Sequence, residues 1–254
     1  MVDIHSHLLY GIDDGPETLE QSLAMLQAAI AGGTTDIVAT PHANPEFDFD
    51  PELISERVAE LQDAGGPIRI HTGCDFHLSY TNVNDAVENP AKYAINQKNC
   101  LLVELSDLTI FKNTESDFER LQNAGLLLII THPERNGLLR QRLERLRSWV
   151  EMGCYLQVTG QSAVGKFGSK AKEFTDKLLD ENLVHFVASD AHDTRNRPPD
   201  LQEAFRQVRK KYGEKRAERL FVSNPAAALT GDPIASGDPA EEQNSKKWFQ
   251  VWKR

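Results

Sequence analysis

Cysteine is scarce in this sequence: the 254 residues include only three, Cys74, Cys100 and Cys154. Their spacing fits neither a disulfide framework nor a zinc knuckle, so we interpret them as small core residues. No apolar run is long enough to span a membrane, and no basic and apolar leader follows Met1. These absences predict a cytoplasmic chain with no integral membrane segment.

Positive charge is also in deficit. The chain has 28 Lys and Arg against 38 Asp and Glu, a formal net charge of -10. This balance argues against a general affinity for nucleic acid or for an anionic membrane. It does not exclude an anionic substrate, because bound divalent cations would invert the local field at a site.

Compositional breaks are few. There is no internal repeat, and the apolar periodicity continues to about Gly231, where a Gly-Asp-Pro element begins. The length suits one barrel and is too short for a barrel plus a second domain. We therefore predict a single domain over residues 1–231 and a polar, flexible tail over residues 232–254.

Short apolar runs alternate with amphipathic segments along the chain. The runs at 37–39, 68–70, 101–103, 127–130, 150–158 and 185–188 predict strands, and Met1 leads into another. Helical spacing predicts helices over 18–31, 51–64, 115–124, 138–152, 170–182 and 199–212. The alternation predicts an α/β fold in which helices cover a parallel sheet.

Side chains that can bind a cation follow these runs. His5 and His7 are two residues apart on the first predicted strand, so both point to one side of it. The other candidates are His42, Asp75, Glu104, His132, Asp190 and His192. Their wide scatter favours a barrel, with its site at the carboxyl ends of the strands, over an open sheet. Imidazoles and carboxylates without a thiolate suit Mn, Fe or Zn.

Taken together, the motifs resemble the polymerase and histidinol phosphatase (PHP) superfamily. The matching segments are Asp-Ile-His-Ser-His from Asp3, Asp-Asp-Gly-Pro from Asp13, Thr-Pro-His at 40–42, Gly-Cys-Asp at 73–75, Val-Glu-Leu-Ser at 103–106, His-Pro-Glu-Arg at 132–135, Gln-Val-Thr at 157–159, Ala-Ser-Asp-Ala-His at 188–192 and Arg-Pro-Pro at 197–199. Within the superfamily, the chain is similar to the bacterial manganese-dependent protein-tyrosine phosphatases of capsular and exopolysaccharide synthesis.

The resemblance implies a distorted seven-stranded (β/α)7 TIM-like barrel, the PHP fold, that holds three divalent metal ions. Mn is the expected ion, with Fe or Zn as alternatives. The implied ligands are His5, His7, Asp75 and Asp190 for the first ion, Asp75, Glu104 and His132 for the second, and Asp14, His42 and His192 for the third. The bridging position is usually Glu in these phosphatases, so the shorter Asp75 puts occupancy of the second site in question.

The implied reaction is hydrolysis of a phosphomonoester by metal-activated hydroxide, which attacks phosphorus directly. Arg135 and Arg197 match motif positions that contact phosphate, and Asp14 or His42 would assist. A cysteine-dependent phosphatase is excluded, because the positions that should carry its arginine hold Tyr80, Ser106 and Gly160. The implied substrate is a phosphotyrosine protein, namely a bacterial tyrosine autokinase.

Two other functions stay open at this point. One is a small-molecule phosphatase of the same superfamily, acting on histidinol phosphate or a nucleotide. The other is an inactive metal-binding module that binds a partner. The sequence also leaves open whether the chain forms a homo-oligomer. Among the remaining histidines, His71 and His77 are not expected to be ligands, and His185 is expected to be a hydrogen-bonded core residue.

Overall fold

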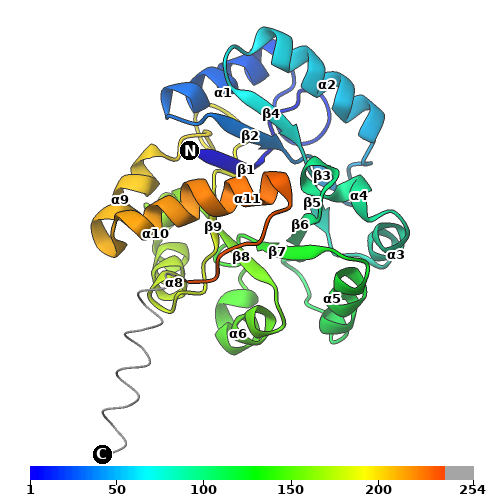
Figure 1. Cartoon of the computed structure of the whole chain (residues 1–254), viewed down its shortest axis with the longest axis vertical. Helices are drawn as coiled ribbons and strands as arrows, with labels where there is room; N and C mark the ends of the chain where they lie inside the picture. Colours follow the sequence, from blue (N-terminus) through cyan, green and yellow to red (C-terminus); the bar gives the residue numbers. More distant parts are fainter. Residues whose placement is uncertain (238–254) are drawn as a thin grey trace, which may run out of the picture.

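The computed structural model describes residues 1–237, in which strands and helices alternate (Figure 1). The strands are β1 (Val2–Ser6), β2 (Asp36–Ala39), β3 (His42–Ala43), β4 (Arg69–Thr72), β5 (Asp75–His77), β6 (Cys100–Glu104), β7 (Leu127–Thr131), β8 (Tyr155–Thr159) and β9 (Phe186–Ala188). The helices are α1 (Leu19–Ala31), α2 (Pro51–Ala64), α3 (Tyr80–Glu88), α4 (Pro90–Tyr93), α5 (Thr114–Asn123), α6 (Leu143–Glu151), α7 (Gly160–Ala163), α8 (Ser169–Asp180), α9 (Gln202–Tyr212), α10 (Glu214–Glu218) and α11 (Asn224–Thr230). Three further turns are η1 (Ile95–Gln97), η2 (Leu139–Gln141) and the π-helical η3 (Arg219–Ser223).

The strands form two parallel sheets, in the orders β1-β2-β4 and β3-β5-β6-β7-β8-β9. The predicted α/β fold with a parallel sheet is therefore confirmed, but the pairings of the described strands do not close a seven-stranded barrel. The two sheets also meet beyond β9, where the N–H of Asp190 donates to the carbonyl of His5 and the N–H of His7 donates to that of Ala191, both at 2.8 Å. These bonds place the end of β1 beside the segment that follows β9.

Two neighbouring stretches of extended backbone are interrupted where the first sheet passes into the second. Pro41, which lacks an N–H, separates β2 from β3, and Gly73 lies between β4 and β5. A Cβ at Gly73 would lie only 2.9 Å from Cγ1 of Val38, so this close approach of strands requires glycine. Beyond the break, His42 pairs in register with Asp75. The break thus places two candidate ligands side by side at the edge of the second sheet.

The predicted helices are present, with two differences at their ends. Thr18 caps α1 and Asp50 caps α2, since their side chains accept hydrogen bonds from N–H groups of the first turn. The single helix predicted over 138–152 is wrong: it is divided at Arg142 into η2 and α6. The helix predicted to start at 199 starts at Gln202 instead, because Pro198 and Pro199 precede it.

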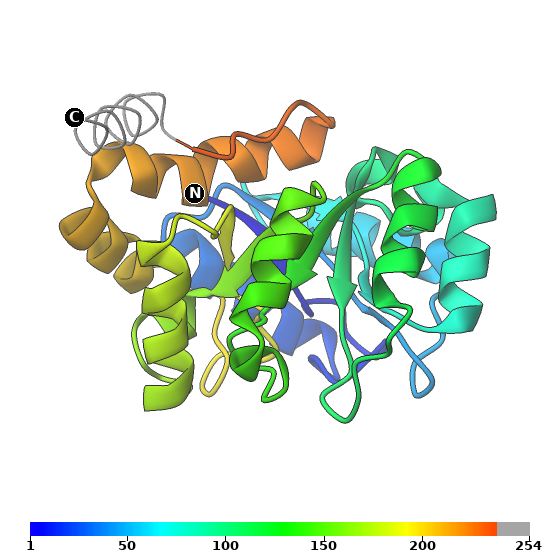
Figure 2. The same ribbon diagram turned by 90° about the horizontal axis from the view of Figure 1, so that it is seen from below.

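Helices α10 and α11 lie across the molecule on the side away from the loops that follow the strands (Figure 2). Ala228 and Leu229 of α11 pack against Val2 and Phe186, the first residues of β1 and β9. Ile234 is buried in the same cluster, so the start of the segment predicted as a tail lies against the domain. The rest of that segment, 238–254, lies outside the described residues. Within residues 1–237, no helix is long and apolar enough to cross a membrane.

Candidate metal centre

The nine predicted metal ligands converge at the carboxyl ends of the strands. Ligand atoms within 4.8 Å of one another form four overlapping groups: His7, Asp14, His42 and His192; His5, His7 and Asp75; His5, His132 and Asp190; and His42, Asp75 and Glu104. Every predicted ligand therefore belongs to at least one group. The overlap through His5, His7, His42 and Asp75 makes the groups one continuous cluster.

Three of the histidines have Nδ1 held by an oxygen atom. Nδ1 of His5 lies 3.0 Å from Oε1 of Gln157, and Nδ1 of His192 lies 3.1 Å from the carbonyl of Asp190. Nδ1 of His7 lies 2.7 Å from Oδ2 of Asp13. Because these oxygens accept, we assign the ring proton to Nδ1, which leaves the lone pair of each Nε2 facing the cluster.

The Nε2 atoms and carboxylate oxygens meet at the spacing that a shared cation requires. Nε2 of His5 and Nε2 of His7 are 3.4 Å apart, and each lies 3.5 or 3.6 Å from Oδ1 of Asp190. Two lone pairs and an anionic oxygen directed at one point would repel one another, unless a proton or a cation lies between them.

Asp75 is buried at the centre of the cluster. Its Oδ2 lies 3.5 Å from Nε2 of His5, 4.0 Å from Nε2 of His7 and 3.3 Å from Nδ1 of His42. Neither oxygen of Asp75 has a hydrogen-bond partner among the described residues. A buried carboxylate without hydrogen bonds is costly, so Asp75 fits a cation that touches both sides of the cluster.

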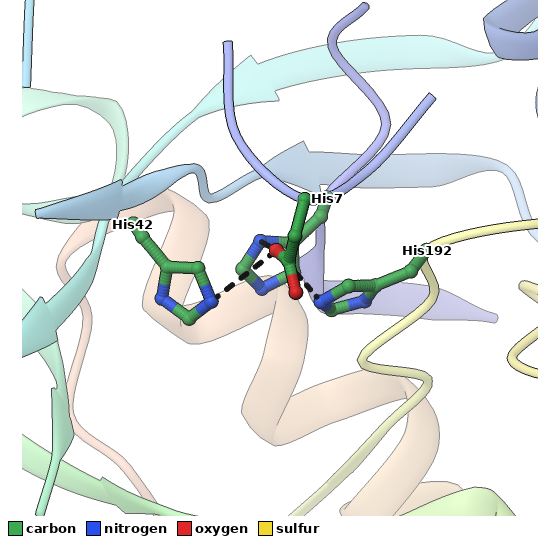
Figure 3. Close-up of side chains that lie close together, drawn as sticks. His7, His42 and His192 are labelled. Atoms are coloured by element: carbon green, nitrogen blue, oxygen red, sulfur yellow. Dashed lines mark ion pairs between the residues drawn. The ribbon is translucent and has the colours of Figure 1, made fainter. Parts of the chain in front are cut away.

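Asp14 lies at the exposed side of the cluster. Its Oδ1 lies 3.3 Å from Nε2 of His192 and 3.5 Å from Nε2 of His42. Figure 3 shows the imidazoles of His7, His42 and His192 turned toward one another, and Asp14 belongs to the same group of ligand atoms. The Asp14 side chain is 48% exposed, whereas that of Asp75 is 1% exposed. Asp14 therefore lies at the entrance and Asp75 at the bottom of the site.

Glu104 and His132 complete the cluster on the other side. Oε1 of Glu104 lies 3.8 Å from Nε2 of His132, and its Oε2 lies 3.7 Å from Nδ1 of His42. Glu104 is also 3.7 Å from Nδ1 of His77, although His77 belongs to none of the four groups. His71 lies away from the cluster, with Nε2 3.1 Å from Asp36.

Both predicted phosphate-binding arginines reach the cluster. Nη2 of Arg197 donates to Oδ2 of Asp190 at 2.6 Å, and Nη1 of Arg135 donates to the same oxygen. Oδ1 of Asp190 remains directed at His5 and His7. One carboxylate therefore joins the two guanidinium groups to the predicted ligands.

The backbone is strained at two predicted ligands. His132 has φ 32° and Asp190 has φ 53°, in the left-handed region that non-glycine residues rarely adopt. His132 directly follows β7, and Asp190 lies two residues after the end of β9. Residues with strained backbone angles are common at functional sites, where contacts with the surrounding fold compensate for the cost of the strain.

The protonation of the histidines follows from burial and from the carboxylates. Burial lowers the pKa of His132 to about 3 and lowers that of His7 well below its ordinary value, so both are neutral at pH 7. Burial opposes protonation of His5 as well, but the charges of Asp75 and Asp190 outweigh it and raise its pKa to about 9. A divalent cation would compete with that proton for the same two carboxylates.

Three residues of the site were missed by the sequence reasoning. Asp13 and Gln157 hold His7 and His5, as described above. The Phe47 ring stacks on the His42 ring, with 6.1 Å between centroids and 13° between planes. Asp13 belongs to the Asp-Asp-Gly-Pro motif and Gln157 to the Gln-Val-Thr motif. Both motifs were among the segments that resemble the family, so the sequence did mark these positions as candidates. Nothing in the sequence indicated the stacking of Phe47.

The residues thus fit divalent metal ions, as judged by the converging Nε2 atoms and the unpartnered oxygens of Asp75. Cysteine takes no part in the cluster: Cys74, Cys100 and Cys154 are buried, and burial raises the pKa of the Cys100 and Cys154 thiols to about 12. A thiolate nucleophile is therefore not available, and the prediction that these cysteines are core residues is confirmed.

Comparisons with known proteins agree with this geometry. The family model described as capsular polysaccharide synthesis, CpsB/CapC, matches residues 1–230. The chain belongs to this family. It is 32% identical to CapC of Staphylococcus aureus, over 98% of this chain and 99% of CapC. It is also 32% identical to the tyrosine-protein phosphatase CpsB of Streptococcus pneumoniae, over 89% of this chain and 96% of CpsB.

The fold is shared with a solved member of the family. A crystal structure from the work on YwqE of Bacillus subtilis and CpsB of Streptococcus pneumoniae, described as unique metal-dependent tyrosine phosphatases, matches with a TM-score of 0.86. The match covers 92% of this chain and 96% of the other, at 31% identity. The resemblance inferred from the sequence motifs is thereby confirmed at the level of the family.

Proposed function

We propose that this chain is a metal-dependent protein-tyrosine phosphatase. The observation that carries the proposal is the single cluster of nine ligating side chains with two guanidinium groups at its side. Its family membership and the names of its relatives support the same activity. The proposed ions are manganese, with iron or zinc as alternatives that the same nitrogen and oxygen donors accept.

The proposed ligands form three sets, of which the first two share Asp75. His5, His7, Asp75 and Asp190 hold the first ion, Asp75, Glu104 and His132 the second, and Asp14, His42 and His192 the third. A shared role for Asp75 is supported by its Oδ2, which lies within 4.0 Å of His5, His7 and His42. The shorter side chain of Asp75 thus reaches both sides of the cluster. The four spatial groups divide the ligands differently, since His132 is grouped with His5 and Asp190, and His42 with Asp75 and Glu104. His7 lies between the first and third sets and contacts members of both.

Divalent ions in such a cluster lower the pKa of a coordinated water and neutralise the charge of the phosphoryl group. Arg135 and Arg197 lie beside the ligands, where planar guanidinium groups bind phosphate oxygens and stabilise the charge that develops on them. The leaving tyrosine has a pKa of about 10, so it departs with less help from an acid than an alkyl alcohol needs. The half-exposed Asp14 and the neighbouring His42 border the entrance through which it leaves.

The proposal extends to the fold and to the substrate. The two parallel sheets, joined by the bonds between β1 and the segment after β9, are proposed to form a distorted barrel of the TIM-like class. The proposed substrate is a phosphotyrosine protein of capsular polysaccharide synthesis, with a bacterial tyrosine autokinase as the candidate. The description of the matched family supports this choice.

A metal-reconstitution experiment with matched substrates tests the proposal. The chain is stripped with a chelator, and turnover of a phosphotyrosyl peptide, the same peptide with phosphoserine, and histidinol phosphate is measured before and after Mn²⁺ is restored. We expect Mn²⁺ to restore turnover of the phosphotyrosyl peptide well above that of the other two substrates. Faster turnover of histidinol phosphate would replace the proposal with a small-molecule phosphatase. Binding of metal without any turnover would replace it with an inactive module.

A further inference from the structure

A groove with cationic walls lies next to the cluster. It is a cavity of about 440 Å³ lined by Arg135, Arg140, Phe167, Gly168, Ser169, Lys170 and Ala171. A second hollow of about 410 Å³ continues it past Arg140 and Lys170 to Lys177. We call these two hollows the basic groove. The chain has a net charge of -10, so the positive charge of the groove has the opposite sign to the protein as a whole.

Arg135 connects the basic groove to the metal centre. The same residue lines a small cavity with Glu104 and His132. Its guanidinium lies over the Phe167 ring, 4.7 Å from the centroid, and also donates to Asp190. A ligand whose phosphate lies in the cluster can therefore extend along Phe167 into the basic groove.

Arg135 is paired with Asp190, but the other three cations of the groove have no carboxylate partner in the described part of the protein. Nη1 of Arg140 donates to the carbonyls of Glu134 and Arg135, at 2.9 and 2.7 Å, which holds its guanidinium at the wall. Within residues 1–237, no carboxylate forms an ion pair with Arg140, Lys170 or Lys177, although Glu173 also lines the second hollow, so that three cations and one carboxylate face it. The first turn of α8 also lines the groove, and its positive dipole end adds to the potential.

A second flank of the cluster, beside His192, has the reverse charge. A cavity of about 530 Å³ beside His192 is lined by the predicted ligand Asp14, by two further carboxylates, those of Glu17 and Asp193, and by one arginine, Arg195. An extended peptide that crosses the site thus meets cations on one flank and carboxylates on the other. Such an arrangement favours peptides whose acidic residues lie on the cationic flank, and it disfavours peptides whose acidic residues lie on the acidic flank.

We propose that the basic groove binds an acidic side chain of the substrate peptide, close in sequence to the phosphotyrosine. The inference rests on the proposed phosphatase function and adds the substrate class: a phosphotyrosine flanked on one side by Asp or Glu. Exposed charge pairs contribute little individually, so two or three cations predict a preference of about threefold to tenfold at low salt. The preference falls as salt screens the pairs.

Peptide pairs and charge-reversal variants test the inference. Turnover is measured with phosphotyrosyl peptides that carry Glu or Gln at each nearby position, and with para-nitrophenyl phosphate, which cannot reach the groove. We expect a higher kcat/KM for Glu at positions on one side of the phosphotyrosine. Lys170→Glu, alone and with Lys177→Glu, is expected to abolish or reverse that preference while turnover of para-nitrophenyl phosphate is unchanged. The matched control is Lys98→Glu. Lys98 is an exposed lysine at the C-terminal end of η1, and we expect this variant to keep the preference.

A binding measurement separates this inference from the phosphatase proposal. Fluorescence anisotropy measures the affinity of the protein for an unphosphorylated Glu-rich peptide and for its Gln counterpart, and this measurement does not depend on turnover. Tighter binding of the Glu peptide, lost in Lys170→Glu, would support the groove even if no phosphatase activity were found. Equal binding of the two peptides, or a Glu preference that Lys170→Glu and the double variant leave intact, would overturn it.

Discussion

Oδ2 of Asp13 lies 2.7 Å from Nδ1 of His7 and accepts the backbone N–H of His42 at 3.1 Å. One buried carboxylate oxygen thus orients two predicted ligands from different strands. The other oxygen accepts the N–H of Gly15, which holds the Asp-Asp-Gly-Pro loop in place. Asp13 is a positioning residue, since it acts on the cluster through His7 and His42.

Replacement of Asp13 by Asn is expected to weaken metal binding. An amide cannot stabilise the Nδ1–H of His7 as a carboxylate does, and losses of about 10- to 100-fold in affinity are typical for such partners. Calorimetric titration of the stripped protein with Mn²⁺ measures the change. Asp63→Asn, on the exposed surface of α2, is the control. An affinity for Mn²⁺ equal to that of the wild type would contradict the role of Asp13.

The second prediction concerns Asp75 as a shared ligand. Asp75→Ala removes an anionic oxygen that faces His5 and His42 from opposite sides, so we expect lower metal content and a loss of turnover by orders of magnitude. Asp75→Glu restores the carboxylate and is expected to retain much of both. Metal content by mass spectrometry and turnover of para-nitrophenyl phosphate test this together. Full metal content with full turnover in Asp75→Ala would refute a shared ligand.

Much of the site could be predicted because ligand types and strand ends are local features of the sequence. His5 and His7 share strand parity, and His132 and Asp190 each lie two residues after an apolar run. The contacts that orient these ligands were not predictable in the same way. Gln157 reaches His5 from β8, 152 residues away in sequence. Only the folded chain shows that pair, because no local pattern relates the two residues.

The fold shows the same limit. Periodicity predicted the helices that bury one face over several turns, but it missed α3, α4, α7, α10 and α11. All of these except α3 are too short to show a period. The break between β4 and β5 lies at Gly73, where the chain approaches Val38 of β2, a residue distant in sequence. Such breaks decide how strands pair, and for that reason the two-sheet pairing was not evident from the sequence.

The third prediction separates the two arginines from the metal ligands. Arg135→Ala and Arg197→Ala are each expected to lower kcat by about a hundredfold with little change in KM, as for loss of a donor to the transition state. Both arginines also hold Asp190, so metal content must be measured on the same samples. The control is Arg209→Ala, on the exposed face of α9. Unchanged kinetics in both single variants and in the double variant would exclude a phosphate contact.

The last prediction concerns stability and lies outside the metal centre. His185 is buried, and its Nδ1 accepts the backbone N–H of Leu156 at 3.2 Å, so the ring is neutral. Burial, together with the charge of Arg219, lowers the pKa of His185 to about 4. This agrees with the core role predicted for it from the sequence.

Because the folded pKa lies below the unfolded value of about 6.5, the unfolded chain binds the proton more readily. The stabilising contribution is therefore present above pH 6.5 and is lost as the pH falls toward 4, by about 3 kcal/mol at most. His185→Gln keeps an acceptor for Leu156 but cannot titrate. Its free energy of unfolding, from urea titrations between pH 7 and 4, should decline less steeply than that of the wild type. Parallel pH profiles for the two proteins would show that His185 does not contribute to the acid sensitivity.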